Sequence, residues 1–154
     1  MKEKRSILFV CTGNICRSPT AEGVLRKMAA AGGLELRVES AGTHDYHVGE
    51  APDERAQRHA RDRGYELAGQ RARHLRLRDF EQFDLIVAMD RRHLQILEAR
   101  CPAEHRHKLR LLVPGNDVPD PYYGGPEGFE QVLDMVEGAC AALLAELRTP
   151  AGRP

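Results

Sequence analysis

Short apolar segments and longer helical patterns alternate along the whole chain, and this alternation restricts the fold more than any other feature of the sequence. The apolar segments predict strands at Lys4–Val10, Leu36–Ser40, Asp84–Met89 and Lys108–Val113. Helical patterns follow these segments at 18–31, 52–63, 90–100 and from about 126 to 147. A chain of this kind folds into a parallel sheet with right-handed crossovers and helices on both faces. We therefore predict a three-layer α/β fold.

The chain carries no sign of a second domain. Its 154 residues can bury a core of their own, so we predict a single domain over residues 1–154, with a frayed tail from Thr149 onward. Formal net charge is zero, which gives no general attraction to nucleic acid or to an anionic membrane. No secretory signal or membrane-spanning run is visible. We expect a cytoplasmic monomer that binds neither nucleic acid nor membrane.

Four cysteines are too few for a disulfide framework, which favours a reducing compartment. Cys11 and Cys16 lack the spacing of a zinc site, and no second pair of ligands accompanies them. Cys101 is expected at the end of a helix, and Cys140 is expected in the core. The sequence predicts neither a metal site nor a cofactor.

The strand ends of a parallel sheet indicate where a ligand would bind. Parallel strands direct their C-terminal ends to one edge, and ligands of such folds bind at that edge. The loops that follow the predicted strands contain residues 11–18, 40–46, 90 and 117–123. We therefore expect groups that lie more than a hundred residues apart in sequence to gather around Cys11.

The loop after the first strand combines a thiol with features of an anion site. It reads Cys11, Thr12, Gly13, Asn14, Ile15, Cys16, Arg17, Ser18 and is followed by Pro19. A helix N-terminus presents free N–H groups and a positive dipole, which bind an oxyanion and lower the pKa of a thiol beside them. Gly13 and Asn14 tolerate left-handed backbone, and the planar fork of Arg17 fits phosphate oxygens. Ser18 is expected to cap the helix and to donate a hydrogen bond to the thiolate.

A buried structural cysteine is the alternative reading of Cys11, and the surrounding loop argues against it. The nucleotide-binding pattern G-x4-G-K-[ST] is absent, so the anion is interpreted as a phosphoryl group that sulfur attacks. A phosphocysteine would then form, with its oxygens on the loop N–H groups and Arg17. Asp120, between two prolines, is predicted to protonate the leaving oxygen and later to activate water. A Pro-Asp-Pro run alone would favour a surface turn, and Asp117 is the second candidate for the acid.

The loop 11–19 resembles the signature of the low-molecular-weight protein tyrosine phosphatases. The resemblance continues through residues 39–43, 48–53, 83–90 and 120–123, so it covers nearly the whole chain. It implies a four-stranded parallel sheet and metal-free hydrolysis of aryl phosphates. It also implies Cys11 as nucleophile, Arg17 as the phosphate-binding arginine and Asp120 as acid, with Asn14 and Ser18 shaping the loop and stabilising the thiolate. The implied pocket walls are Ile15, Tyr46, Tyr122 and Tyr123.

Two positions leave questions open within this resemblance. Gln70 stands where many relatives have a His; it can still donate a hydrogen bond to the loop but cannot titrate. Cys16 is either a resolving partner that protects oxidised Cys11 by forming a disulfide or a packing residue of the loop. The sequence favours neither reading of Cys16.

Other functions remain open beside phosphotyrosine hydrolysis. A protein-arginine phosphatase of the same fold is the first alternative, although that branch carries Thr at the position of Ile15. A thiol-dependent arsenate reductase would need further redox cysteines, and residues 60–100 contain none. A non-catalytic phosphotyrosine-binding module would need Arg17 but neither Cys11 nor Asp120. The expected partners are phosphotyrosine proteins or small aryl phosphates, with phosphate as product and inhibitor.

Overall fold

The computed structural model describes residues 5–122 and 124–148. The elements in chain order are β1 (Arg5–Cys11), α1 (Arg17–Ala31), β2 (Leu36–Gly42), α2 (Glu54–Asp62), α3 (Asp79–Gln82), β3 (Leu85–Ala88), α4 (Arg91–Arg100), the 3-10 helix η1 (Ala103–Lys108), β4 (Leu109–Leu111) and α5 (Pro126–Arg148). The four predicted strands and the four predicted helices are therefore present, while the short elements α3 and η1 were not predicted. The predicted tail from Thr149 and the predicted pocket wall Tyr123 lie outside the described residues.

The strands form one parallel sheet in the order β2-β1-β3-β4, which confirms the predicted four-stranded parallel sheet. β1 lies inside the sheet, with β2 on one side and β3 on the other. In this register Cys11, the last residue of β1, lies opposite Gly42, the last residue of β2. The chain leaves both strands at the same edge of the sheet, so the segments that follow them meet there.

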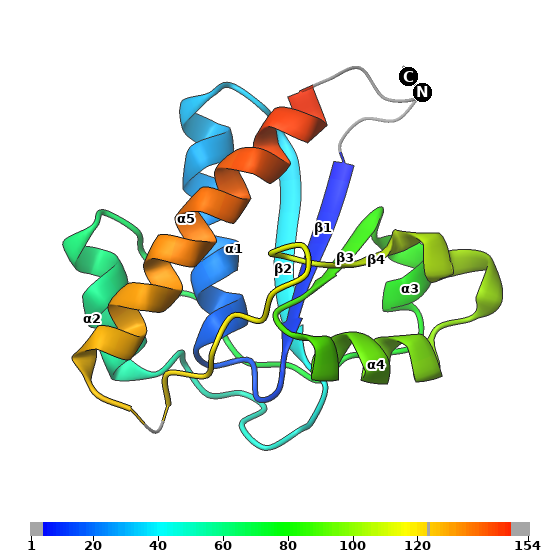
Figure 1. Ribbon diagram of the computed structural model, residues 1–154, viewed down its shortest axis with the longest axis horizontal. Helices are drawn as coiled ribbons and strands as arrows, with labels where there is room; N and C mark the ends of the chain where they lie inside the picture. The colour runs from blue at the N-terminus through cyan, green and yellow to red at the C-terminus, as the bar shows by residue number, and fades with distance from the viewer. Residues whose placement is uncertain (1–4, 123, 149–154) are drawn as a thin grey trace.

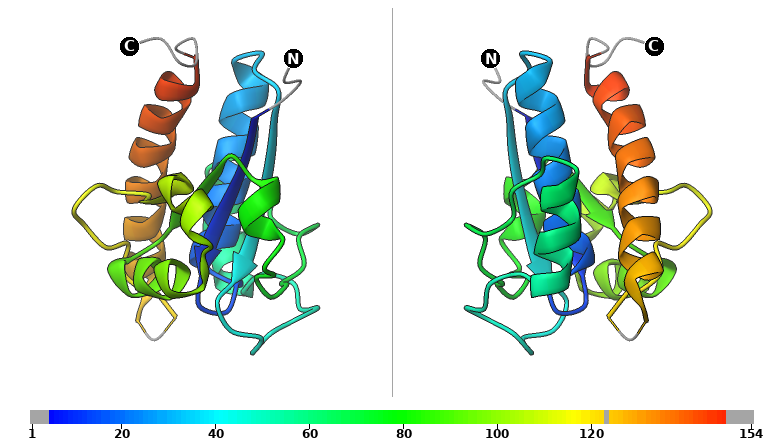
Figure 2. Two further views of the ribbon diagram at one scale, coloured as in Figure 1. Left: turned by 90° about the vertical axis from the view of Figure 1, so that its right-hand side faces the viewer. Right: turned by 90° about the vertical axis from the view of Figure 1, so that its left-hand side faces the viewer.

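Helices cover both faces of the sheet, as predicted. Helices α1, α2 and α5 lie on one face, and α3 and α4 lie on the other (Figures 1 and 2). The side chains of β1 alternate accordingly, because successive residues of a strand point to opposite faces. Ile7 and Phe9 pack into the core under α1 and α5, whereas Leu8 and Val10 pack into the core under α3 and α4.

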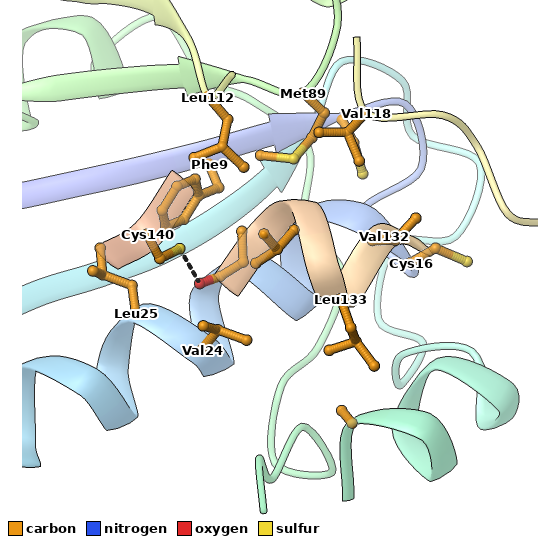
Figure 3. Close-up of a cluster of buried hydrophobic side chains, with 14 of the residues drawn as sticks. Phe9, Cys16, Val24, Leu25, Met89, Leu112, Val118, Val132, Leu133 and Cys140 are labelled. Atoms are coloured by element: carbon orange, nitrogen blue, oxygen red, sulfur yellow. Dashed lines mark hydrogen bonds between the residues drawn. The ribbon is translucent and has the colours of Figure 1, made fainter. Parts of the chain in front are cut away.

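The core between α1, α5 and the sheet fixes the position of α1. Figure 3 shows Phe9, Val24, Leu25, Leu133 and Cys140 gathered there. The Cys140 thiol faces the Ala21 carbonyl oxygen of α1 at 3.9 Å, so Cys140 is a core residue as predicted. Full burial of a large apolar side chain contributes about 1.5–3 kcal/mol. Several such side chains therefore hold α1 against the sheet and with it the loop at its N-terminus.

The helix ends follow the capping residues with one exception. Asp90 caps α4 through a hydrogen bond from the His93 N–H, and Cys101 lies at the C-terminal end of that helix, both as predicted. Gly32 ends α1, also as predicted. The predicted cap at Ser18 is wrong: α1 begins at Arg17, its N-cap residue is Cys16, and no side chain caps it. Within the described residues, no helix is long and apolar enough to cross a membrane.

Candidate active site

The Cys11 thiol is buried at the N-terminus of α1. Its Sγ accepts a hydrogen bond from the Ser18 N–H at 3.4 Å and lies 2.9 Å from Ser18 Oγ. This contact explains why Ser18 does not cap the helix, since its hydroxyl is turned toward the sulfur. The first-turn N–H groups of a helix have no partner within the helix, so they are available to a thiolate or an oxyanion.

Asn14 determines the direction of the hydrogen bonds around the thiol. Its Nδ2 donates to Ser18 Oγ at 2.8 Å and to Ser40 Oγ at 2.9 Å, and its Oδ1 accepts from the Arg73 N–H at 3.0 Å. Ser18 Oγ therefore accepts from Asn14, and its own proton is left for Cys11 Sγ. Asn14 has a φ of 61°, which is the left-handed backbone expected from the residue type.

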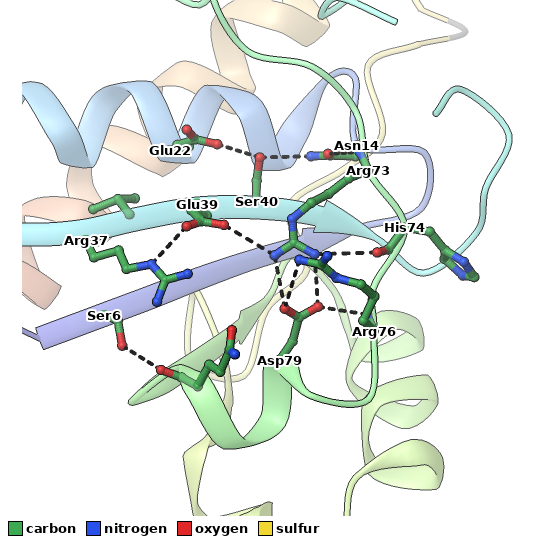
Figure 4. A network of polar contacts seen from close by, with 12 residues as sticks. Ser6, Asn14, Glu22, Arg37, Glu39, Ser40, Arg73, His74, Arg76 and Asp79 are labelled. Carbon is green, nitrogen blue, oxygen red and sulfur yellow. Dashed lines mark hydrogen bonds and ion pairs between the residues drawn. The ribbon is translucent and has the colours of Figure 1, made fainter. Parts of the chain in front are cut away.

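A buried polar chain continues behind Asn14. Ser40 Oγ donates to Glu22 Oε1 at 2.7 Å, as Figure 4 shows. Burial raises the pKa of Glu22 above its usual value, partly offset by the Ser40 hydrogen bond and the Arg26 charge. Sequence reasoning missed Glu22, Ser40 and Arg73 in this role. The spacing of residues within α1 and β2 gives no sign of it, because their meeting depends on how the helix packs on the sheet.

The guanidinium of Arg17 is held by two groups from distant loops. Its Nη1 donates to Asp90 Oδ2 at 3.0 Å and to the Val118 carbonyl oxygen at 2.9 Å. Its Nη2 lies 3.7 Å from Asp120 Oδ2. Arg17 is almost fully buried, so its orientation is fixed before any ligand binds. Asp90 was predicted as a helix cap and as one of the groups at the edge of the sheet near Cys11, but its hydrogen bond with Arg17 was not predicted.

The end of β2 packs tightly against the loop. The Cys11 carbonyl oxygen accepts from the Thr43 N–H at 2.8 Å, and the Thr12 carbonyl oxygen accepts from the His44 N–H at 3.0 Å. A Cβ atom on Gly42 would lie 2.7 Å from the Thr12 carbonyl oxygen, which is closer than side chains approach. Only glycine fits at this position without movement of the backbone.

The two aspartates proposed for acid chemistry differ in their surroundings. Asp120 borders the same pocket as Cys11, its side chain is 44% exposed, and its Oδ1 accepts from the Tyr122 N–H at 3.0 Å. Asp117 instead accepts from the backbone N–H of Arg91 at 3.0 Å and from its guanidinium at 3.1 Å. These two hydrogen bonds hold the pKa of Asp117 below its usual value, the backbone bond being the larger effect.

The loop and its neighbours enclose a pocket of ≈ 210 Å³. Its lining comprises Cys11, Thr12, Gly13, Ile15, Cys16, Arg17, Tyr46, His47, Asp120 and Tyr122. Tyr46 is 65% exposed and stacks on His44 with 4.9 Å between ring centroids, so it forms the outer rim rather than a buried wall. His47 lies so close over Gly13 that a Cβ atom on Gly13 would be 2.8 Å from the His47 ring.

The remaining predicted positions lie beside the loop. Cys16 is buried, and burial, followed by the nearby Asp53 carboxylate, raises its pKa far above the usual value for a thiol. Gln70 donates from Nε2 to the carbonyl oxygen of Pro19 at 3.0 Å, in the first turn of α1. No group of three or more His, Cys, Asp or Glu side chains in the described part of the chain is arranged to hold a metal ion.

A parallel sheet with a thiol in an anion-binding loop at its edge suits an enzyme whose thiolate attacks the central atom of a bound oxyanion. Comparison with known proteins gives the same class of protein. The model of the family described as low molecular weight phosphotyrosine protein phosphatase matches residues 6–151. A low molecular weight protein-tyrosine-phosphatase of Streptomyces coelicolor is 47% identical over 153 residues, which cover 92% of this chain and 93% of that protein.

Solved structures are similar over the same extent. A protein tyrosine phosphatase from Entamoeba histolytica with Hepes in its active site has a TM-score of 0.90 and 39% identity, covering 94% of this chain and 97% of that one. Wzb of Vibrio vulnificus in complex with benzylphosphonate has a TM-score of 0.84 and 30% identity, covering 94% and 99%. The chain belongs to the low molecular weight phosphotyrosine protein phosphatase family, as the resemblance implied.

Proposed function

We propose that the protein is a tyrosine phosphatase that hydrolyses phosphotyrosine and other aryl phosphate monoesters through a phosphocysteine on Cys11, without a metal ion. The observation that carries the proposal is one pocket lined by the Cys11 thiol, the Arg17 guanidinium and the Asp120 carboxyl group. A nucleophile, a phosphate-binding cation and a proton donor within one pocket are what a phosphoryl transfer to sulfur needs.

In the first step the thiolate of Cys11 attacks phosphorus, and the bond between phosphorus and the ester oxygen breaks. Asp120 in its acid form gives its proton to the departing phenolate. The loop N–H groups and Arg17 hold the three remaining phosphoryl oxygens as negative charge accumulates on them. The Ser18 hydroxyl, whose proton points to the sulfur, stabilises the thiolate before the attack and again when it leaves.

In the second step a water molecule attacks the phosphocysteine. The Asp120 carboxylate, left ionised by the first step, takes a proton from this water. The sulfur–phosphorus bond breaks, inorganic phosphate leaves, and the Cys11 thiolate is restored. The same carboxyl group thus serves as acid and then as base, and no metal or cofactor enters either step.

Hydrolysis of p-nitrophenyl phosphate in EDTA at mildly acid pH tests the nucleophile. Cys11→Ser should abolish turnover, because a neutral hydroxyl is a far weaker nucleophile than a thiolate. Cys101→Ser, at the end of α4 outside the pocket, is the matched control and should retain turnover. Activity that survives Cys11→Ser, or that requires a metal ion, would exclude the cysteine mechanism.

The leaving group tests the acid. Asp120→Asn should slow phenyl phosphate, whose leaving group needs a proton, far more than p-nitrophenyl phosphate, whose leaving group does not. Asp117→Asn is the matched control, since Asp117 bonds to Arg91 and does not line the pocket. An equal loss on both substrates in Asp120→Asn would remove Asp120 from the role of acid.

The aromatic rim supports tyrosine as the substrate residue. Tyr46 and Tyr122 border the pocket and can stack on a phenyl ring. The benzylphosphonate bound to Wzb, a structural relative, also joins a phenyl ring to a phosphorus oxyanion. The alternative is a protein-arginine phosphatase. Turnover of matched phosphotyrosine and phosphoarginine peptides distinguishes them, and preference for phosphoarginine would overturn the tyrosine assignment.

We further propose that Cys16 protects an oxidised nucleophile in a cytoplasmic, monomeric enzyme. Oxidation of Cys11 to a sulfenic acid would let the Cys16 thiol displace water and form a disulfide. The raised pKa of Cys16 predicts that this closure is slow, because the attacking form is the thiolate. Peroxide-treated wild type should recover activity with a thiol reductant, and Cys16→Ser should recover less. Equal recovery would leave Cys16 a packing residue.

A further inference from the structure

The phosphate-binding loop has a buried neighbour that the mechanism above does not use. His93 lies in the first turn of α4, and its ring is 1% exposed. Its Nε2 is 2.8 Å from Thr12 Oγ1, on the second residue of the loop. The Thr12 carbonyl oxygen accepts from the His44 N–H, just after β2, whereas His93 contacts the Thr12 hydroxyl group.

The other side of the His93 ring faces the group that orients Arg17. Asp90 Oδ1 accepts a hydrogen bond from the backbone N–H of His93 at 2.9 Å, and it also lies 3.0 Å from the ring atom His93 Nδ1. Asp90 Oδ2 accepts from Arg17 Nη1. One imidazole is therefore placed between the start of the loop, at Thr12, and the carboxylate that holds the phosphate-binding arginine near its end.

We propose that His93 is a positioning residue, which fixes the Thr12 end of the phosphate-binding loop and, through Asp90, the direction of Arg17. This inference rests on the phosphatase function proposed above and deepens it. His93 touches neither the thiol nor the pocket, so it acts on the reaction only through these two neighbours.

The surroundings of the ring determine its proton. Burial lowers the pKa of His93 to about 4, and the charge of Arg17 is the next largest cause. The carboxylates of Asp90 and Asp120 raise this pKa, and Arg92 lowers it by a smaller amount. The ring is therefore neutral at the mildly acid pH of the assay, with one nitrogen as donor and the other as acceptor.

The carboxylate decides which nitrogen carries the hydrogen. A lone pair on Nδ1 would face Asp90 Oδ1 at 3.0 Å and be repelled, so the hydrogen belongs on Nδ1. The contact between His93 Nδ1 and Asp90 Oδ1 is nevertheless not a regular hydrogen bond. Nδ1 is one of two buried side-chain atoms in the described residues that have no hydrogen-bond partner. Nε2 then accepts the Thr12 hydroxyl proton. That proton is committed to His93, so the loop N–H groups and Arg17 remain the donors to phosphate.

Four single variants and one double variant, His93→Leu with Thr12→Val, test this role. His93→Leu removes both ring contacts, His93→Gln keeps a polar group in reach of Thr12, and Thr12→Val removes only the hydroxyl. Leu97→Ala is the matched control, because Leu97 is buried in the same helix but lies outside the pocket and the loop. The readouts are the melting temperature, kcat and KM for p-nitrophenyl phosphate, and the affinity for inorganic phosphate by calorimetry.

We expect His93→Leu and Thr12→Val each to lower kcat and phosphate affinity about tenfold. The double variant should lose no more kcat or phosphate affinity than either single variant, because both changes remove the same contact. His93→Gln should retain part of the kcat and phosphate affinity that His93→Leu loses. Leu97→Ala should lower the melting temperature yet keep kcat and phosphate affinity within twofold. If His93→Leu behaves like Leu97→Ala, His93 is only a packing residue. If His93→Leu does not fold, unchanged phosphate affinity in Thr12→Val overturns the proposal.

The two proposals fail separately. If the wild-type protein shows no turnover, or if its turnover does not depend on Cys11, the phosphatase function is refuted. This result does not depend on the role of His93. Phosphate binding measured by calorimetry needs no turnover, so it still tests the contact between His93 and Thr12. An active wild type with His93 variants of unchanged kcat and phosphate affinity refutes only the positioning role.

Discussion

Replacement of Asn14 should separate two contributions that one residue makes to the loop. Its side chain makes three hydrogen bonds, to Ser18, Ser40 and the backbone of Arg73, and its φ is 61°. Asn14→Gly removes the side chain but tolerates the left-handed backbone. Asn14→Ala removes the same bonds and also places a Cβ in an unfavourable conformation. The difference between the two variants therefore reports the backbone alone.

The magnitudes follow from the structure. A buried intramolecular hydrogen bond contributes about 1 kcal/mol net, so loss of the three bonds should lower the free energy of unfolding by about 3 kcal/mol in Asn14→Gly. A left-handed alanine adds roughly 1 kcal/mol, so Asn14→Ala should lose about 4 kcal/mol. Both variants should also lose kcat, because the Ser18 hydroxyl no longer accepts from Asn14 and is free to turn away from Cys11.

Urea unfolding monitored by circular dichroism measures these differences. Asn116, an exposed asparagine in the segment before Asp117, provides the matched pair Asn116→Gly and Asn116→Ala, and both should stay within about 0.5 kcal/mol of wild type. Equal stability of Asn14→Ala and Asn14→Gly would refute the argument from backbone conformation. Losses below about 1 kcal/mol in both would refute the argument from hydrogen bonding.

Three further predictions concern the surroundings of the loop. Gly42→Ala should destabilise by about 2 kcal/mol in urea unfolding, because its Cβ would press on the Thr12 carbonyl oxygen at 2.7 Å; wild-type stability would contradict this. Asp79→Asn should lower the free energy of unfolding in urea by about 3 kcal/mol, because buried Asp79 accepts two hydrogen bonds from the Arg73 guanidinium (Figure 4). A decrease below about 1 kcal/mol would contradict this prediction. The pKa of His93 is lowered to about 4, so as pH falls from about 6.5 the unfolded chain binds a proton on this residue before the folded protein does. Acidification to pH 4 should therefore lower the free energy of unfolding by roughly 3 kcal/mol through His93 alone. His93→Gln should lack this part of the loss, and parallel pH profiles of unfolding for the two proteins would refute the argument.

Local residue types predicted the features that depend on local structure. Glycine and asparagine in the loop indicated left-handed backbone, and Asn14 adopts it. Asp90 before a helical pattern indicated a cap, and it caps α4. The strands and their parallel direction followed from the alternation of apolar and helical segments, although the order of the strands in the sheet was not predicted. For the left-handed turn and the helix cap, the energy that selects the structure comes from neighbours in sequence.

The sequence predicted that Asp120 and Cys11 lie at one pocket, but it missed several other contacts between residues far apart in sequence. Ser18 followed by proline reads as a helix cap, yet the demand of the Cys11 sulfur for a hydrogen bond turns its hydroxyl elsewhere, and the helix begins at Arg17. The contacts of Arg17 with Asp90 and of His93 with Thr12 arise only because β1 and β3 are adjacent in the sheet. Helices as short as α3 are too brief for a periodic pattern to show.

The partner of Arg17 at Val118 has a consequence for the order in which the enzyme becomes competent. The ribosome adds Val118 101 residues after Arg17. A nascent chain therefore carries the nucleophile through the synthesis of these residues before the Val118 carbonyl oxygen can fix the direction of the arginine beside it. A fragment that contains the entire signature loop but stops before Val118 would likewise expose a thiol without a formed phosphate site. The motif cannot be transplanted as a short peptide, because its geometry is completed by a residue 101 positions further along the chain.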